Sequence, residues 1–350
     1  MRPASPRRRI SSGALPAAAL AFLLLAAAPA RAAGTDAGPP PVCAGRDLSA
    51  DPALDAQTLA RARARRADDG VNGQGLLWRI DKPPAAPSWL FGTIHTTDDR
   101  AIAIARAAAK HIAGARIVAT ELGGPFDAYA RAELGATLMI KAMARDGDTL
   151  AGLGAPAEVA QVEAFLAARG LGATMAHHLR PWFLAALAAA PLCEAERQRR
   201  ELPVVDDLLA RLASDQGVKV VGLETAAEQA DLLAAIDPKL SAEALLSTAR
   251  RPETSEDFFA TLVSLYVQQR PSDIFAVIDA SRLLTPEETR AEDAMTQALL
   301  GARNKTMADR LAPLLAPGGA FVAVGALHLV GAGGLIALLR AQGYAVTAAP

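Results

Sequence analysis

The sequence predicts an α/β fold, or α+β with a large helical insertion, built on a mainly parallel central sheet. Two observations lead to this prediction. A unit of strand, Gly-x-x-His, helix and strand occurs twice, once near residue 92 and again near residue 325. Between the copies lies a long region, interrupted by one strand, in which apolar residues recur at helical spacing. Strands that alternate with helices in this way are typical of a parallel sheet.

Each expected element has a local signal. The β-prone runs 76–80 and 88–91 are separated by Lys82-Pro83-Pro84, as in a hairpin. Asp98 and Asp99 suit the N-cap and first turn of the helix that follows. The expected strands lie at 76–80, 88–91, 116–122, 218–223, 320–324 and 343–347. The expected helices lie at 101–111, 150–170, 181–190, 204–214, 226–235, 241–250, 256–269, 286–300 and 334–341.

The chain is expected to carry an export signal. Residues 1–32 combine the basic run Arg7-Arg8-Arg9, an apolar run over 14–29 and a small-x-small end, so we expect cleavage near Ala32. The apolar run is shorter than the roughly 20 residues that span a bilayer. We therefore expect a periplasmic or secreted protein with no transmembrane anchor after cleavage. The arginine run leaves both Sec and twin-arginine export open.

One domain is expected behind this signal. Residues 33–75, rich in Gly, Pro, Ala and Asp, should form a loosely packed leader. The domain itself is expected at 76–350, with its helical insertion at about 126–215 and 226–310. The sequence does not indicate an oligomeric state.

Composition argues against one kind of partner. Lys plus Arg (36) nearly balances Asp plus Glu (37), and aromatic residues make up only 4%. Such a chain has neither the basic field nor the stacking platforms that nucleic-acid binding uses, so no nucleic-acid partner is expected. The two cysteines, Cys43 and Cys193, lie in no metal-ligand spacing. In an oxidising compartment they could form one disulfide or remain two unpaired buried thiols.

Polar side chains follow four of the expected strands. His95 and His328 end the two Gly-x-x-His motifs, and Glu121 and Glu224 lie at the ends of two other strands. Because ligands of open α/β sheets bind beyond the carboxyl ends of the strands, we expect these four side chains at one edge. The glycine of each motif is expected to adopt a backbone conformation closed to other residues, so that the chain can turn off the strand.

Two neutral imidazoles and a carboxylate make an open divalent-metal site, in which a bound water becomes a nucleophile near neutral pH. A second carboxylate could act as general base or fix a histidine tautomer. Simpler interpretations stay open, because each motif histidine could be a turn residue. Glu224 could instead cap the helix that begins at Ala226. His111, His177 and His178 are expected to be structural or at the surface.

Several short strings carry a resemblance to a known family. They are, in order, Trp89-Leu-Phe-Gly-Thr-Ile-His95, Thr120-Glu121-Leu122, Val205-Asp206, Leu223-Glu224-Thr225, Glu228-Gln229, Arg303-Asn304, Val324 to Gly331, and Gly343-Tyr344. In this order they resemble the TraB/GumN family (TraB/PrgY/GumN) over roughly residues 76–348. That family is related to the Tiki-type metalloproteases and, more distantly, to erythromycin esterase-like and ChaN-like proteins.

The resemblance implies roles for particular residues. His95, His328 and Glu121 would be metal ligands, with Glu121 alternatively the general base. Arg303 would bind substrate or stabilise a transition state, because its planar guanidinium can grip a carboxylate or an oxyanion. Asn304 could add a hydrogen-bond donor. Without the resemblance, Arg303-Asn304 would be interpreted as a turn between helices. Glu224 is a further catalytic candidate.

The predicted function is a divalent-metal-dependent peptidase or related hydrolase that uses Mn, Co or Zn and acts on a peptide or small-molecule substrate. One alternative is a non-catalytic envelope protein that binds a peptide signal or a haem or iron ligand. Another is a structural envelope protein with a relic site. Unlike some relatives, this chain shows no apolar run near its C-terminus that is long enough for a membrane segment.

Overall fold

The computed structural model describes residues 38–66, 70–124, 128–144, 149–152, 154–281 and 286–349. The expected signal peptide, residues 1–32, lies outside these ranges.

A six-stranded sheet with the order β4-β3-β5-β2-β1-β6 forms the centre of the fold. Its strands are β1 (Leu77–Asp81), β2 (Ser88–Thr93), β3 (Ile117–Thr120), β4 (Val220–Gly222), β5 (Ala320–Gly325) and β6 (Ala345–Ala348). Neighbours β4, β3, β5 and β2 pair in parallel, and β1 is antiparallel to both β2 and β6. β1 alone therefore runs against the rest, which confirms the mainly parallel sheet.

The two strands at the heart of the sheet are buried on both faces. Every residue of β3 and β5 is buried, as expected for parallel strands covered by helices on each side. The expected hairpin is also present, since Leu77 of β1 lies opposite Phe91 of β2. The two Gly-x-x-His units differ in the position of their last strand. In the first unit, β3 lies inside the sheet beside β5, whereas in the second unit β6 lies at the edge beside β1.

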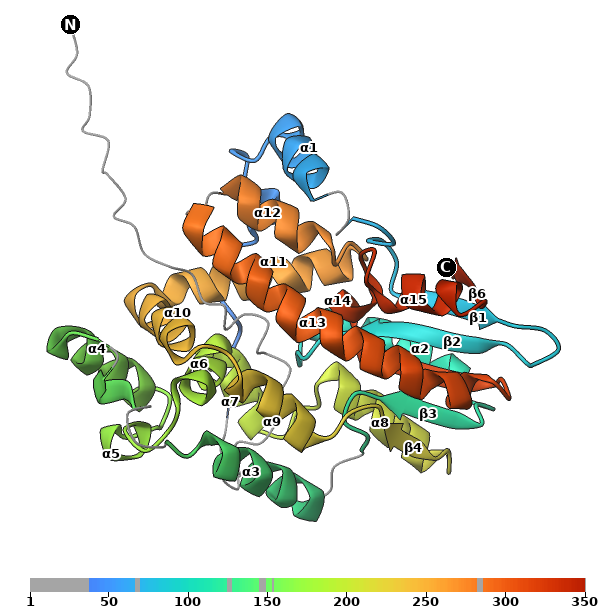
Figure 1. The fold of residues 1–350 in the computed structure, drawn as a ribbon, viewed down its shortest axis with the longest axis horizontal. Helices are drawn as coiled ribbons and strands as arrows, with labels where there is room; N and C mark the ends of the chain where they lie inside the picture. The colour runs from blue at the N-terminus through green and yellow to red at the C-terminus, as the bar shows by residue number, and fades with distance from the viewer. Residues whose placement is uncertain are drawn as a thin grey trace, which may run out of the picture.

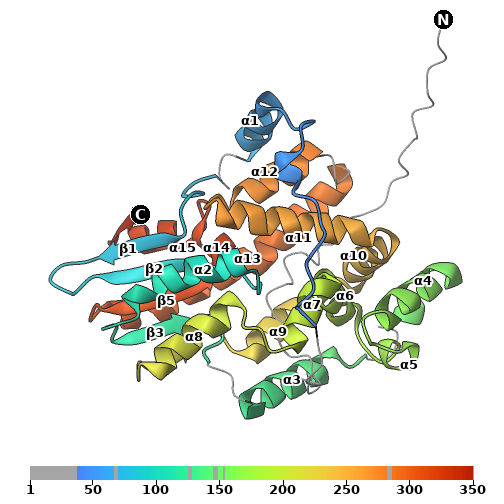
Figure 2. The same cartoon turned by 180° about the vertical axis from the view of Figure 1, so that it is seen from behind.

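Helices cover both faces of the sheet (Figures 1 and 2). On one face lie α13 (Pro286–Leu315) and α15 (Leu335–Ala341), which bury Leu311 and Leu339 against the strands. On the other face lie α2 (Asp99–Ala108) and α8 (Val205–Asp215), which bury Ala105 and Leu209. The sheet is thus the middle layer of three.

The region between the two Gly-x-x-His motifs is mostly helical, as predicted, and it forms a body beside the sheet (Figure 1). Leu166, Leu184 and Leu245, from three of its helices, are fully buried in its own apolar core. The helices are α3 (Ala128–Ala142), α4 (Pro156–Ala167), α5 (Ala173–Ala176), α6 (Pro181–Ala189), α7 (Leu192–Arg199), α9 (Ala226–Ala234), α10 (Pro238–Arg250), α11 (Pro252–Val267) and α12 (Asp273–Ser281). Short turns of 3₁₀ helix lie at Ala109–His111 and Leu150–Gly152, and α14 (Ala326–Leu329) follows β5.

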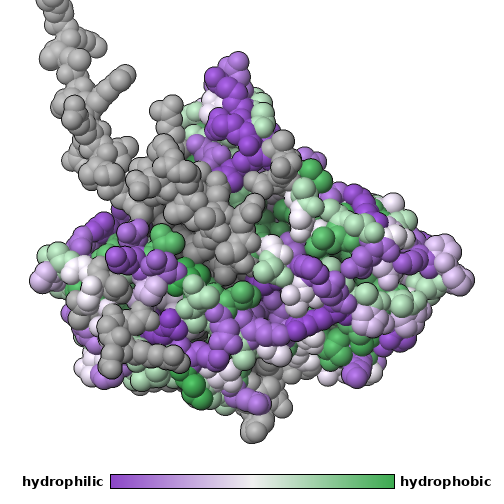
Figure 3. Space-filling model, viewed as in Figure 1, coloured by the Kyte–Doolittle hydropathy of each residue, from purple (hydrophilic) through white to green (hydrophobic). Residues whose placement is uncertain are grey.

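The leader is more firmly packed than the sequence suggests. A 3₁₀ turn (Leu48–Ala50) and the helix α1 (Ala56–Arg65) lie within it, and Ala62 is fully buried. Leu48 packs in an apolar cluster with side chains of α11 and α12. The composition of the leader indicated a loose tail, but Leu48, Leu54 and Leu59 pack against apolar side chains of α11 and α12. Its outer face is strongly hydrophilic, as the top of Figure 3 shows over α1.

The two cysteines form the disulfide that the sequence left open. Cys43 and Cys193 are bonded, with their Cα atoms 5.3 Å apart. A disulfide is compatible with an oxidising, extracytoplasmic compartment. Within the described ranges, no helix combines the length and the apolar character needed to cross a membrane.

Candidate functional site

The two Gly-x-x-His motifs lie side by side in the sheet. β2 and β5 are parallel neighbours in which Gly92 faces Val324 and Thr93 faces Gly325. A Cβ atom on Gly92 would lie 3.0 Å from the Cα of Ala326, inside the second motif. Neither motif glycine has a positive φ, so the expected special backbone conformation is wrong. Gly92 is needed because the two motifs approach each other closely.

We expect Gly92→Ala to lower the free energy of unfolding by about 1–3 kcal/mol, because the new methyl group would press on the backbone of Ala326. Gly301→Ala is the matched control. Gly301 lies exposed on α13 with open space around its Cα, so alanine there should stabilise the protein by up to about 1 kcal/mol. Urea unfolding followed by circular dichroism measures both. Equal effects would contradict the close approach of the motifs.

His95 is fixed by a carboxylate from α8. Its Nδ1 lies 2.7 Å from Oδ2 of Asp206, and the other carboxylate oxygen accepts the Thr93 hydroxyl at 2.6 Å. Burial lowers the pKa of an imidazole, but Asp206 outweighs this and raises the pKa of His95 to about 9. The ring is therefore protonated at neutral pH and forms an ion pair with Asp206.

His328 is fixed by an amide from α13. Asn304 donates Nδ2–H to the Gly333 carbonyl at 3.0 Å, which turns its Oδ1 toward Nδ1 of His328 at 2.6 Å. Since an amide oxygen only accepts, His328 carries its proton on Nδ1 and a lone pair on Nε2. Burial, reinforced by Arg303, lowers its pKa to about 3, so the ring is neutral. Asn304 thus positions His328 through its Oδ1, and one N–H of its amide is engaged with Gly333.

Glu121 and Glu224 lie next to each other at the ends of β3 and β4. The Glu224 backbone N–H donates to the Glu121 carbonyl at 2.8 Å, and the two side chains are only 4% and 6% exposed. One oxygen of Glu121 accepts the Gly325 N–H at 2.7 Å, which ties β3 to the second motif. Glu224 does not cap α9; Thr225 does, in a capping box with Glu228.

Arg303, on α13, joins the two carboxylates. Its Nη2 donates to Glu121 at 2.5 Å and to Glu224 at 2.6 Å, and its Nε also donates to Glu224. Gln229 of α9 adds a hydrogen bond to Glu224 at 3.0 Å. Burial would raise the pKa of Glu121, but the Arg303 guanidinium and, less strongly, the two imidazoles lower it to about 2. Arg303 thus lies in a helix, not in the turn that was the alternative.

Two imidazole nitrogens at this edge have no partner. The Nε2 atoms of His95 and His328 are buried, and neither has a hydrogen bond within the described residues. The His328 Nε2 lies 3.8 Å from Oε1 of Glu121. Buried polar atoms are rarely left unpaired, and a metal-bound histidine generally has its other nitrogen held by a polar group. Here Nδ1 of His328 is hydrogen-bonded to Asn304, and Nδ1 of His95 is ion-paired with Asp206. The two histidines therefore fit metal ligands.

The carboxylates fit a metal less completely. Across the described ranges, no group of three or more His, Cys, Asp and Glu side chains is arranged to hold a metal ion. The reason is visible in the contacts, because Arg303 occupies one oxygen of Glu121 and both of Glu224. Of the oxygens of these two glutamates, Oε1 of Glu121 is the one that lies near an imidazole, 3.8 Å from Nε2 of His328.

A protein-family model matches most of the chain. The profile of the TraB/PrgY/gumN family matches residues 76–348, which include all four strand-end residues. The chain belongs to the TraB/PrgY/gumN family. No curated protein and no solved structure matches it significantly.

Two contributors to the site of this family member were assigned no role from the sequence. Asp206 lies 111 positions from His95 in the sequence. Its only local sign is an acidic residue in the first turn of a helix, which is common and does not indicate a site. Gln229 is a single amide inside an otherwise ordinary helix. Both belong to strings that resemble the TraB/PrgY/gumN family, and only that resemblance could have drawn attention to them.

Proposed function

We propose that the protein is an extracytoplasmic, divalent-metal-dependent hydrolase, with a peptide or small-molecule substrate. His95 and His328 would hold the ion through Nε2, and Glu121 through Oε1. One observation carries the proposal: the imidazoles of the two neighbouring motifs have buried Nε2 atoms with no hydrogen bond among the described residues, while Asp206 and Asn304 hold their Nδ1 atoms. When bound, a divalent ion supplies Lewis-acid activation of water and of a substrate carbonyl.

The remaining groups have distinct tasks. A carboxylate with a pKa of about 2 has little tendency to take up a proton, so Glu121 suits a ligand better than a general base. Glu224 orients Arg303 and balances its charge. The Nη1 of Arg303 donates to no described group, and this edge of the guanidinium is the one we assign to a substrate carbonyl or carboxylate.

Metal analysis of the purified exported protein tests the proposal. We expect about one Mn, Co or Zn ion per chain, and a loss of affinity of at least about 100-fold in His95→Ala and in His328→Ala, since each removes one ligand. His178→Ala is the control, because that histidine is exposed and its ring makes one hydrogen bond among the described residues, to the Thr174 carbonyl. Mass spectrometry of a peptide library then detects cleavage. Full metal content in both variants would contradict the proposal.

A non-catalytic binding protein is the second candidate. It is favoured by the binding of both carboxylates to Arg303. Among the four strand-end residues, the Nε2 atoms of the two histidines then remain as the side-chain atoms without a hydrogen bond in the described residues. Such a protein would retain a peptide or an iron ligand in stoichiometric amount, and the same mass spectra would show no product.

A further inference from the structure

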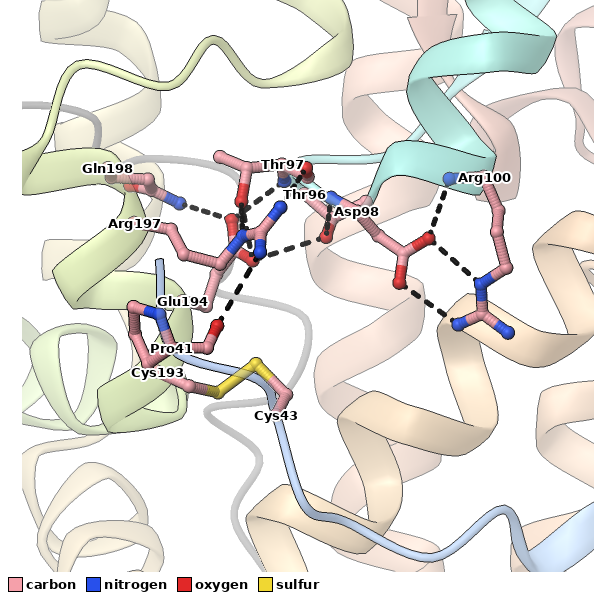
Figure 4. The surroundings of a disulfide bond; sticks show 10 residues. All are labelled: Pro41, Cys43, Thr96, Thr97, Asp98, Arg100, Cys193, Glu194, Arg197 and Gln198. Carbon is pink, nitrogen blue, oxygen red and sulfur yellow. Dashed lines mark hydrogen bonds and ion pairs between the residues drawn. A yellow bond between two sulfur atoms is a disulfide. The ribbon is translucent and has the colours of Figure 1, made fainter. Parts of the chain in front are cut away.

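The loop that follows His95 is held by a buried carboxylate from a distant helix. Thr96 and Thr97 are 0% and 2% exposed. Glu194 of α7, itself 1% exposed, accepts the Thr97 N–H at 2.8 Å, the Thr97 hydroxyl at 3.1 Å and the Thr96 hydroxyl at 3.3 Å (Figure 4). Glu194 therefore fixes the backbone two residues from His95.

Two more side chains of α7 complete this contact. Arg197 donates to the Thr97 hydroxyl at 2.7 Å and to the Thr97 carbonyl at 2.9 Å. Gln198 donates to Glu194 at 3.1 Å. Residues three and four apart share one face of a helix, so a single face of α7 holds the loop, as Figure 4 shows.

Apolar packing contributes little to the position of α7. Among its residues, Leu192–Arg199, only Glu194 is buried. Besides its polar contacts, α7 has one covalent anchor, the bond from Cys193 to Cys43. Just after the helix, Arg200 donates to the Gly38 carbonyl at 2.6 Å. The placement of α7 therefore depends on the N-terminal tail to which the disulfide ties it.

That tail is anchored on α11, a helix that also contacts the strand leading to His95. Its Leu48 N–H donates to the Thr261 hydroxyl of α11 at 2.8 Å. From the same helix, the Tyr266 hydroxyl donates to the Gly92 carbonyl at 2.9 Å. The disulfide thus ties α7 to a tail that is itself hydrogen-bonded to α11, and these two helices hold the segment 92–97 at its two ends.

We propose that the Cys43–Cys193 disulfide is a redox-sensitive clamp on residues 94–98, and that reducing it by a dithiol loosens this loop and weakens metal binding at His95. Only the effect on metal binding rests on the proposed function. Both cysteines are partly exposed and accessible to a thiolate. One thiolate of the dithiol displaces a cysteine sulfur, and its second thiolate releases the other. The products are two cysteine thiols and the oxidised, cyclic disulfide of the reductant.

Hydrogen exchange and zinc titration on the exported protein test the clamp. One sample is reduced with dithiothreitol, alkylated with iodoacetamide and freed of reagents, and the other is alkylated without reduction. We expect the 92–100 peptide to exchange at least about tenfold faster after reduction, the β5 peptide to be unchanged and zinc affinity to fall about tenfold. The double variant Cys43→Ser, Cys193→Ser should show the exchange rate and the zinc affinity of the reduced sample, and treatment with the dithiol should change neither.

A second pair of variants tests the route through α7. Glu194→Ala should raise exchange at 92–100 in the oxidised protein, and Glu194→Gln, which keeps an acceptor for the Thr97 N–H, should partly restore protection. Glu163→Ala is the control, because Glu163 of α4 pairs with His177 and not with α7 or the loop.

The outcomes separate the clamp from the proposed function. Unchanged exchange at 92–100 after reduction would overturn the clamp, whether or not zinc binds. Faster exchange with equal zinc affinity in both states would overturn its effect on the site. Faster exchange in a protein that binds no metal in either state would support the clamp on the loop and contradict the proposed function.

Discussion

Arg303→Met should destabilise the protein by about 3–5 kcal/mol, because it leaves two buried carboxylates without their shared cation. Glu121 and Glu224 are 4% and 6% exposed, and Arg303 donates to both. Urea unfolding at pH 7 measures the loss. Adding Glu224→Gln should recover part of it, since only one buried charge then remains.

Arg310→Met, on the same helix, is the control for this prediction. Arg310 pairs with Glu228, and both side chains are more than 40% exposed, so the loss should be under about 1 kcal/mol. Equal losses in the two variants would show that Arg303 is not the cation on which the buried carboxylates depend.

The loss of unfolding free energy in Arg303→Met should also be smaller at acidic pH. In the native protein, the lowered pKa of Glu121 gives stability that is present above its usual pKa near 4.5 and is lost as pH falls through about 2. Without Arg303, burial raises that pKa, so the folded variant favours the protonated carboxyl. The two proteins should therefore differ less at pH 4 than at pH 7.

The sequence predicted the positions of the site residues better than their interactions. A period of two for strands and of three to four for helices is a local property, so the strand ends at His95, Glu121, Glu224 and His328 could be found directly. Their meeting at one edge follows from the parallel direction of β4, β3, β5 and β2. The crossover of β6 to the far edge has no local signal, because strand order depends on packing between distant segments.

The interactions were harder to predict for the same reason. Asp206 reaches His95 and Arg303 reaches Glu121 across 111 and 182 positions, and no spacing rule connects such residues. A glycine just before a turn suggests a positive φ, but close contact between two motifs also requires glycine. Only the sheet register distinguishes the two causes. The contact of Asn304 with His328 had no signal in the sequence, because a side chain's partners depend on which face of the helix meets the site.

Metal affinity should rise about tenfold per pH unit from pH 6.5 to 8.5, or about 100-fold in all, because one proton must leave His95. The pKa of His95 is about 9, so the ring is protonated throughout this range. His328 and Glu121, with pKa values of about 3 and 2, have already lost their protons and contribute nothing to the slope.

Two histidines of ordinary pKa would give a different curve. Both would be neutral above about pH 7, and affinity would level off there. Zinc titrations at pH 6.5, 7.5 and 8.5 separate the two cases, and calorimetry in buffers of different ionisation enthalpy should count about one proton released per ion at pH 7.5. Asp206→Asn removes the carboxylate that raises the pKa of His95, so its curve should level off earlier. A plateau above pH 7 in the unaltered protein would mean that His95 does not bind the ion in competition with a proton.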